Sequence, residues 1–266
     1  MSVPMFILTL ESRGLMLDLR LNDVRQAIKR EGQVSRLALR LNPWLVSGTN
    51  QLLIRVRPVP ALTATAVASP TAGVPPTEPP SLTVTVERGQ QGLVMPSNAK
   101  PLLQFSADPA QLAALPADRI STVMQDGFDA MTLPWRALWA ELPSAGQPTL
   151  PEVYAYLVEY LRALRGHDLD WVVKANRLRT AIMTSSLGLD ADRVNAGYAR
   201  MLNEAPPGAW DLIDEPLISL SQEGGDKVCR VEATGGGPVI RVRGNTTGSG
   251  LSLVLARVSG QLWVVG

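Results

Sequence analysis

The stretch Leu41–Val56, LNPWLVSGTNQLLIRV, combines a tight turn with a strand and decides the fold class of the first part of the chain. Gly48 lacks a Cβ atom, so it can take the positive φ that a tight turn needs. Asn50 has a short amide side chain, which hydrogen-bonds nearby backbone at the start of a strand. Leu52 and Val56 share one face of the strand that follows, since alternate residues point the same way. We therefore expect this turn to close one end of a small β-sandwich by packing.

Strands with one apolar face occur on both sides of this turn. In LMLDLRL, residues 15–21, four leucines alternate with one methionine and two charged residues, which gives one apolar and one mostly polar face. Short alternating strands separated by turn residues predict an antiparallel sandwich over residues 1–106. The other runs with strand character are residues 5–10, 34–41, 51–56 and 82–86.

Proline is concentrated between residues 58 and 80, where seven prolines occur with a single charged residue, Glu78. Proline donates no backbone hydrogen bond and favours extended conformations, so this segment is predicted to be a linker or a long exposed loop. An alternative prediction for residues 61–68 is an edge strand.

Residues 107–210 have helical patterns. Asp108 followed by Pro109 is an N-terminal helix signal. Thr149 and Glu152 have the spacing of a capping box, which predicts the start of a helix. Gly166 is predicted to end that helix. Two further helices are expected over residues 171–188 and from about residue 190, with their apolar side chains on one face.

Residues 215–266 return to strand patterns separated by glycine-rich turns, which predicts an antiparallel meander. Together with the preceding helices it makes an α+β domain over residues 107–266. The fold class is therefore α+β, with a sandwich domain over residues 1–106 and helices packed on a β-meander over residues 107–266.

Composition limits the kinds of partner. Of 266 residues, 45% are hydrophobic and 18% charged, with a net charge of +1, which gives no overall attraction to nucleic acid or membrane. The N-terminus has no basic region before its apolar run, so we expect neither a signal peptide nor a membrane anchor. A cytoplasmic location follows, or a periplasmic one if a leader has been removed.

Arginine outnumbers lysine by 21 to 4, which is typical of a GC-rich bacterial genome.

Charge is unevenly distributed along the chain. Residues 1–60 hold nine Arg and Lys against four Asp and Glu, whereas residues 101–215 hold nine against fifteen. Two readings are open: oppositely charged surfaces coexist in one molecule, or one of them docks a partner of opposite charge.

Side chains that carry out catalysis are scarce. His167 is the single histidine, at a helix junction, and is expected to cap a helix or lie at the surface. Cys229 is the single cysteine, so no disulfide can form within the chain, and its strand context favours a core position. The S-x-x-K pattern at 97–100 lacks a helix, since prolines flank it on both sides.

Acidic and glycine-rich motifs also have plain structural explanations. Asp168 and Asp170 could contribute to a metal site, but at a helix start acids serve the cap. Asp126 and Asp129 could form an acid pair or lie on a solvated helix surface. The glycines of residues 234–239 have strands on both sides and are read as a turn. We predict no catalytic residue, metal ligand or cofactor.

Five cations in the C-terminal strands are candidates for contact with a partner. Guanidinium groups on neighbouring strands can grip carboxylates in a bidentate manner, whereas a solvated sheet face is the alternative. No aromatic residue is interleaved with them, which disfavours nucleic acid. The five residues are Lys227, Arg230, Arg241, Arg243 and Arg257.

Two segments resemble known families. The segment from Leu45 to Val56, with Gly48, Asn50 and Leu52, is similar to a segment of jelly-roll modules attached to glycoside hydrolases, where it has a packing role. The C-terminal LSLVLARVSGQLWVVG resembles the last hairpin of cystatin-like and nuclear-transport-factor-like folds. The whole arrangement is similar to immunity and accessory proteins of bacterial secretion systems.

These observations lead to a functional hypothesis. We expect a non-enzymatic protein-binding protein, a bacterial toxin-immunity or secretion-system accessory protein that acts by surface complementarity. One alternative is a carbohydrate-binding accessory module. Another is a small enzyme with a cone-like α+β fold that uses Tyr154, Tyr160 or Asp129.

Overall fold

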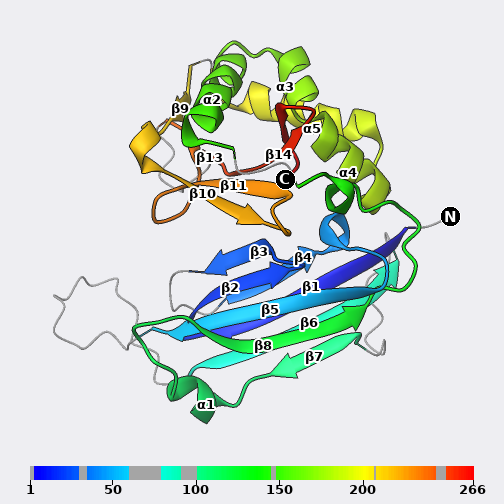
Figure 1. Cartoon of the computed structure of the whole chain (residues 1–266), viewed down its shortest axis with the longest axis vertical. Coiled ribbons are helices and arrows are strands. Elements are labelled where there is room, and N and C mark those ends of the chain that lie inside the picture. Colours follow the sequence, from blue (N-terminus) through cyan, green and yellow to red (C-terminus); the bar gives the residue numbers. More distant parts are fainter. Residues whose placement is uncertain are drawn as a thin grey trace. The chain divides into compact units, whose positions relative to one another are not determined.

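The computed structural model describes residues 3–29, 35–59, 79–90, 101–144, 148–206, 208–243 and 250–266. The chain forms two compact units, Met1–Pro134 and Trp135–Gly266 (Figure 1). The strand pairs of the described residues are antiparallel, and the four longer helices all belong to the second unit. This is the predicted α+β fold class.

The first unit contains two four-stranded antiparallel sheets. Each takes one strand from each of the consecutive pairs β1–β2, β3–β4, β5–β6 and β7–β8, and both sheets keep these pairs in the same order. Only Gly14, with φ of +63°, separates β1 from β2. One sheet has the order β4 (Ser35–Arg40), β1 (Pro4–Arg13), β6 (Ser81–Gln90), β7 (Leu103–Ser106), and the other β3 (Val24–Lys29), β2 (Leu15–Leu21), β5 (Thr49–Pro58), β8 (Ser121–Asp129).

The core of the first unit lies on one face of each sheet. Alternate residues of β1 and β6 are buried in one sheet, and alternate residues of β2 and β5 in the other. Because each sheet buries a single apolar face, the unit is a sandwich with a core between the sheets. Side chains that are at most 1% exposed include Leu8, Leu10, Leu17, Leu19, Leu52, Ile54, Leu82 and Val84.

The turn before β5 closes the sandwich as the sequence predicts. Gly48 has φ of +82°, and Asn50 is fully buried. The Asn50 side chain donates to the carbonyl oxygens of Val46 and Gly48, at 2.9 Å each, and accepts from the Val46 backbone N–H at 2.9 Å. Leu45, also fully buried, follows the short 3-10 helix η1 (Asn42–Trp44).

The boundary between the units differs from the prediction. Residues 107–134 were expected to begin the helical domain, but they hold only the short helix α1 (Pro109–Ala113) before β8, which pairs with β5. They therefore complete the sandwich, and the division falls at Pro134. Strand β3 was not anticipated. The predicted cap at α1 is present, since the Asp108 carboxylate accepts from the Ala110 backbone N–H.

Four helices form one side of the second unit (Figure 1). The apolar stripes of the first, second and fourth of these helices enter a single core, in which Val153, Leu157 and Val172 are fully buried. The expected second helix is divided at Asn176, which ends α3 and begins α4. The helices are α2 (Leu150–Arg165), α3 (Leu169–Ala175), α4 (Arg177–Leu187) and α5 (Ala191–Glu204), after the 3-10 helix η2 (Leu138–Glu141).

The predicted C-terminal meander is divided between two sheets. Strand β12 does not pair with β11, the strand before it, but with β9 and β13, because the glycines between β11 and β12 all take positive φ and redirect the chain. The first sheet has the order β10 (Ile218–Glu223), β11 (Val228–Ala233), β14 (Leu253–Val258), β15 (Gln261–Val264). The second has β13 (Gly250–Leu251), β12 (Ile240–Val242), β9 (Trp210–Leu212), and the 3-10 helix η3 (Glu215–Leu217) precedes β10.

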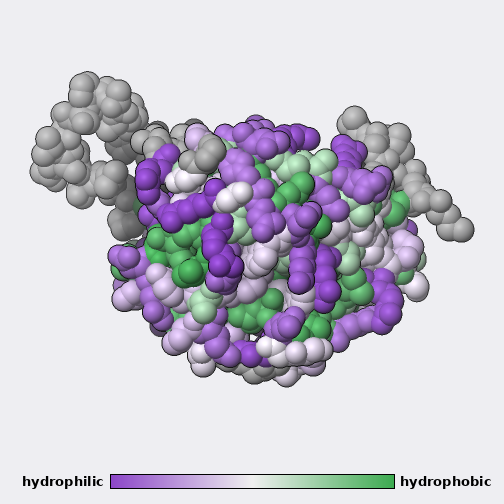
Figure 2. All heavy atoms as spheres, turned by 90° about the horizontal axis from the view of Figure 1, so that it is seen from above, coloured by the Kyte–Doolittle hydropathy of each residue, from purple (hydrophilic) through white to green (hydrophobic). Residues whose placement is uncertain are grey.

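On the face seen in Figure 2, hydrophobic side chains form small areas separated by hydrophilic side chains. Within the described residues, no helix has the length and apolarity needed to span a membrane. The face in Figure 2 has no large apolar area that would indicate a site, and ligand sites are usually concave.

Candidate binding pocket

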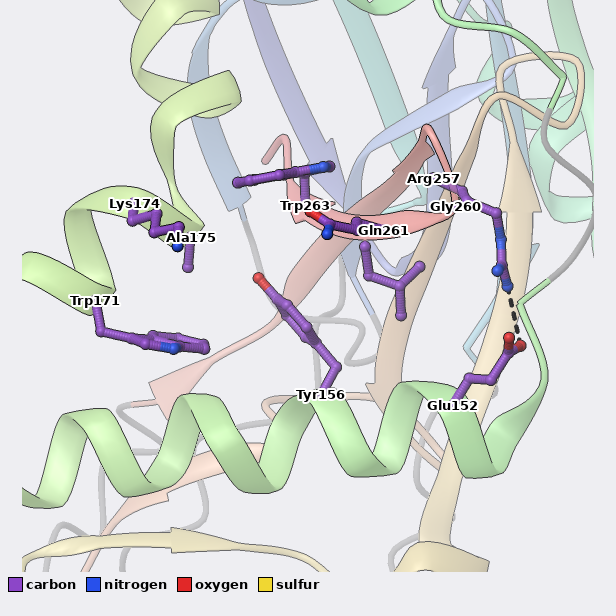
Figure 3. Close-up of a pocket in the computed structure, with 10 residues that line it drawn as sticks. Glu152, Tyr156, Trp171, Lys174, Ala175, Arg257, Gly260, Gln261 and Trp263 are labelled. Atoms are coloured by element: carbon purple, nitrogen blue, oxygen red, sulfur yellow. Dashed lines mark hydrogen bonds and ion pairs between the residues drawn. The ribbon is translucent and has the colours of Figure 1, made fainter.

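A pocket of about 420 Å³ lies within the second unit. Its walls come from the consecutive helices α2 and α3 and from the β14–β15 hairpin, which is far from them in the sequence (Figure 3). This volume falls in the range of typical ligand pockets, about 300–1,000 Å³. The lining residues are Glu152, Tyr156, Trp171, Lys174, Ala175, Arg257, Gly260, Gln261, Leu262 and Trp263.

Helix α2 supplies one wall because of its four-residue spacing. Glu152, Tyr156 and Tyr160 follow one another at intervals of four residues, so they lie along one side of the helix. The start of the helix is fixed by the predicted capping box, in which the Thr149 backbone N–H donates to Glu152 at 2.7 Å. The neighbouring stripe, which includes Leu157, faces the core. The same helix thus packs the unit and carries the pocket.

Helix α3 supplies the facing aromatic wall. The Asp168 carboxylate caps this helix by accepting from the Trp171 backbone N–H at 3.0 Å. The Trp171 ring stands edge-on to Tyr160, with ring centroids 5.5 Å apart and an interplanar angle of 82°. It is also 6.1 Å from the Tyr156 ring. Edge-to-face contacts of this kind stabilise aromatic clusters, so the wall has a defined shape.

Asn176 fixes the position of α3 relative to α2. It is fully buried, and its side-chain amide donates to the Tyr160 hydroxyl at 2.8 Å and to the Val172 carbonyl at 2.9 Å. A buried amide that bridges two helices restrains both of them. The aromatic wall is therefore held by hydrogen bonds as well as by packing.

The β14–β15 hairpin completes the pocket. Its turn consists of Ser259 and Gly260, with φ of +51° and +80°, as two-residue hairpins require. Arg257 of β14 lies opposite Leu262 of β15. Trp263 is 7% exposed, and the Arg177 guanidinium carbon lies 3.7 Å from its ring centroid. This cation–π contact holds the Trp263 ring at the pocket.

The carboxylate in the lining is already engaged. Glu152 accepts from Arg257 at 2.9 Å as well as from the Thr149 backbone N–H. The hydrogen bond from Arg257, followed by those from Thr149, lowers the pKa of Glu152 from 4.5 to about 2. Glu152 is therefore ionised at neutral pH and is a weak base. Its charge is offset by Arg257, which leaves the exposed Lys174 as the remaining cation of the lining.

The Tyr156 hydroxyl is the polar group that points into the pocket. In Figure 3 it is directed toward the space between Trp171, Lys174 and Trp263. Its oxygen is buried and has no hydrogen-bond partner among the residues that the structure describes. Burial raises the pKa of Tyr156, with a smaller contribution from Tyr160. The hydroxyl therefore stays protonated and can donate to an occupant of the pocket.

The arrangement suits binding of a flat apolar group. Two tryptophans, a tyrosine and a leucine provide apolar surface, and a buried hydroxyl provides one directional donor. Pockets of this composition gain affinity from aromatic area and specificity from a few polar groups. In the described parts of the chain, no three His, Cys, Asp or Glu side chains are grouped to hold a metal ion.

The five cations proposed from the sequence do not lie on one strand face. Arg230 and Arg257 lie on strands of one sheet and Arg241 on a strand of the other, whereas Lys227 precedes β11 and Arg243 follows β12. Arg230 makes a bidentate ion pair with the fully buried Glu223, and Arg243 makes one with Asp211. The Lys227 ammonium donates to the Ala140 carbonyl.

The last two of these cations differ in their surroundings. Arg241 is exposed, and its guanidinium donates to the Pro238 carbonyl at 3.2 Å. Arg257 is the member of the set that lines the pocket. The contact role predicted for the whole set stays a prediction.

The other residues considered from the sequence are not brought together in a site within the described residues. Cys229 is 3% exposed, and burial raises the pKa of its thiol to about 11, as expected for a core residue. His167 follows the end of α2 with φ of +52°. Asp126 and Asp129 lie on a strand, β8, and not on the expected helix. The S-x-x-K motif and most of the proline-rich segment lie outside the described residues.

The aromatic lining was not identified from the sequence. Tyr156 and Trp171 are on amphipathic helices, where aromatic residues normally enter the core, and Trp263 was assigned only to a terminal strand. One available signal was the four-residue spacing of Glu152 and Tyr156, which lie beside the core stripe that includes Val153 and Leu157.

No protein-family model, curated protein or solved structure matches this chain. The geometry of the pocket therefore carries the functional argument.

Proposed function

We propose that this chain is a non-enzymatic protein-binding protein and that the pocket of the second unit holds a side chain of its partner. The observation that carries the proposal is the pocket of about 420 Å³ lined by Tyr156, Trp171 and Trp263. Tryptophan, tyrosine and arginine dominate the binding energy of protein interfaces, chiefly where they line well-packed recesses. A recess built from these side chains is suited to anchor a partner.

The state of the ionisable groups supports binding over catalysis. A general base needs a pKa near the working pH, whereas Glu152 has a pKa of about 2 and is held by Arg257 and Thr149. The Tyr160 hydroxyl accepts from Asn176 in the core. Asp129, the acid of the enzyme hypothesis, belongs to the first unit and accepts from the Met131 backbone N–H.

The class of partner is a finer part of the proposal. A binding protein that contributes no chemistry of its own acts by masking or escorting another protein, and charge guides their encounter. A toxin or a component of a secretion system is such a partner. The genes next to this one test the point: a toxin or secretion gene beside it supports the assignment, and a set of metabolic genes contradicts it.

Photo-crosslinking tests the binding site directly. A benzophenone amino acid replaces Gln261, which is exposed at the pocket, or Ser219, which is exposed on β10 in the same unit. In source cells we expect a discrete protein adduct from position 261, identified by mass spectrometry, and none from position 219. Lys174→Glu should abolish the adduct, and Arg200→Glu on the exposed side of α5 should not. Absence of a protein adduct at position 261 contradicts the proposal.

Carbohydrate binding is the second candidate, because aromatic rings also stack on sugar rings. Trp171 and Tyr156 provide rings, and Gln261 and Lys174 provide polar partners at the opening. Binding of the full chain to a glycan array, lost in Trp171→Ala, supports this candidate. A blank array with an intact protein adduct excludes it.

A further inference from the structure

Strand β15 lies at the edge of its sheet and beside the pocket. The sheet order ends with β15, which pairs with β14 alone among the described strands. The two-residue turn at Ser259–Gly260 makes Val258 and Gln261 a hydrogen-bonded pair, and such pairs alternate along an antiparallel ladder. The backbone N–H and C=O groups of Leu262 therefore point away from β14.

The open part of this edge is also part of the pocket. Gln261 is exposed and Leu262 half-buried, and both belong to the pocket lining. Farther along the strand, Arg177 of α4 covers Trp263. The backbone groups of Leu262 are therefore the ones that an added strand can reach. An extended peptide that pairs with a sheet edge gains affinity from its main chain and specificity from its side chains.

The pocket determines which side chain fits beside that edge. Its rings, Trp171 and Trp263, offer flat apolar surfaces on two sides. The Tyr156 hydroxyl is directed into the space between them and lacks a partner among the described residues. An aromatic side chain that enters here gains ring contacts, and a carbonyl of the same segment can accept from Tyr156.

The charge at the opening selects an acidic segment. Lys174 is exposed at the pocket, and Arg177 stacks on the neighbouring tryptophan. The acid of the lining, Glu152, is paired with Arg257. The net charge of this surface is therefore positive, which favours aspartate and glutamate in a bound segment and opposes basic residues.

We propose that the partner's contact is an acidic, extended segment that lies along β15 and inserts one aromatic side chain into the pocket. This inference rests on the proposed protein-binding function, and it names the conformation, charge and anchor residue of the partner.

Selection from a peptide library tests it. A displayed library of random 12-residue peptides is selected on the full chain and counter-selected on Lys174→Glu, a change at an exposed side chain whose folding is checked by circular dichroism. We expect enrichment of peptides with one Phe, Tyr or Trp and with Asp or Glu within two residues of it. Enrichment of basic or strictly helical amphipathic peptides overturns the inference, and so does the absence of any enrichment.

The most enriched peptide then reports the geometry. N-methylation of its amides, one at a time, should weaken binding at the one position whose amide pairs with the Leu262 backbone, and methylation of the adjacent amides, which face away from β15, should not. Tyr156→Phe should weaken binding by about five- to tenfold, the effect of one hydrogen bond. Tyr154→Phe, two residues away on the same helix and outside the pocket, should leave it unchanged. A uniform N-methyl profile contradicts strand addition.

The two proposals fail in different ways. A protein adduct at position 261 together with a failed peptide selection leaves the protein-binding function in place and removes the acidic segment. Loss of both results removes the proposed function itself.

Discussion

Single residues with positive φ determine how the chain turns in both units. Gly48 has φ of +82°, and no atom lies within 4 Å of the place where a Cβ would stand. The requirement for glycine there comes from the backbone and not from crowding. Asn50 then holds the turn with hydrogen bonds to the carbonyls of Val46 and Gly48.

Gly48→Val is expected to destabilise the first unit by about 1–2 kcal/mol, the cost of a left-handed conformation for a residue with a Cβ. Urea unfolding monitored on the first unit measures the change. Thr49→Val, an isosteric change at the next residue, serves as the control and should shift stability by less than about 0.5 kcal/mol. Equal stability of Gly48→Val and the wild type would refute this account.

His167 also has a positive φ, but unlike Gly48 it carries a side chain. Gly166 ends α2 as the sequence predicts, but it has an ordinary φ of −82°, and the positive φ belongs to His167. The His167 backbone N–H donates to Leu164, and that of Asp168 donates to Ala163 at 2.9 Å. This is the Schellman arrangement, with histidine at the position that usually holds glycine.

His167→Gly is therefore expected to stabilise the second unit by about 0.5–1 kcal/mol, since glycine relieves the strain but gains entropy when unfolded. Thermal or urea unfolding measures it. His167→Asn should give a smaller gain, because asparagine tolerates this conformation better than histidine does. A loss of stability in His167→Gly would mean that the imidazole has a contact that outweighs the strain.

At the scale of elements, the start of α2 connects the helix to the hairpin through one carboxylate. Glu152 completes the capping box and accepts from Arg257 of β14. The pKa of Glu152 is lowered to about 2 from 4.5, so the ionised form favours the folded state. The resulting stability is complete above pH 4.5 and is lost as the pH falls toward 2.

Glu152→Gln should accordingly flatten the acid side of the stability profile. Between pH 5 and pH 2, the urea midpoint of the wild type is expected to fall further than that of the variant. Arg257→Gln should flatten the profile in part, because the Arg257 bond is the largest cause of the lowered pKa and the bonds to Thr149 remain. Parallel profiles for the wild type and both variants would contradict the role of this pair.

Elements with local signals could be predicted from the sequence, and those fixed by distant contacts could not. The strand at 15–21 and the capping box of α2 follow from alternation and from Thr149 with Glu152. In β8, a shift in register opposite Ile54 breaks the alternation, and the buried Met124 and Phe128 are four residues apart, as in a helix.

The same limit applies to the division at Asn176 and to the pocket. Asn176 interrupts a continuous apolar stripe because its amide binds Tyr160 on another helix, which the local pattern does not reveal. The pocket brings together Tyr156, Trp171 and Trp263 from distant positions. Each is an ordinary core residue in its own segment, and only the packed structure leaves a space between them.

At the scale of the whole molecule, each unit has its own core. Leu8 is fully buried between the sheets of the first unit, and Leu157 is fully buried in the second. Units with separate cores are expected to open separately.

Leu157→Ala should destabilise the second unit by about 2–5 kcal/mol, through lost contacts and the cavity that remains. Hydrogen exchange measures this change locally: protection should fall in α2 and β14 and stay at the wild-type level in β1 and β5. Leu8→Ala should give the reverse pattern. A loss of protection in both units from either substitution would contradict separate cores.

The single residue between β1 and β2 has a consequence for how this chain tolerates change in length. Because Gly14 is the only residue between β1 and β2, the register of β1 in one sheet fixes the register of β2 in the other. A shift by one residue moves every side chain of a strand to the opposite face. A single insertion or deletion at Gly14 would therefore have to be accommodated by both sheets at once, and lineages of this protein should vary in length elsewhere.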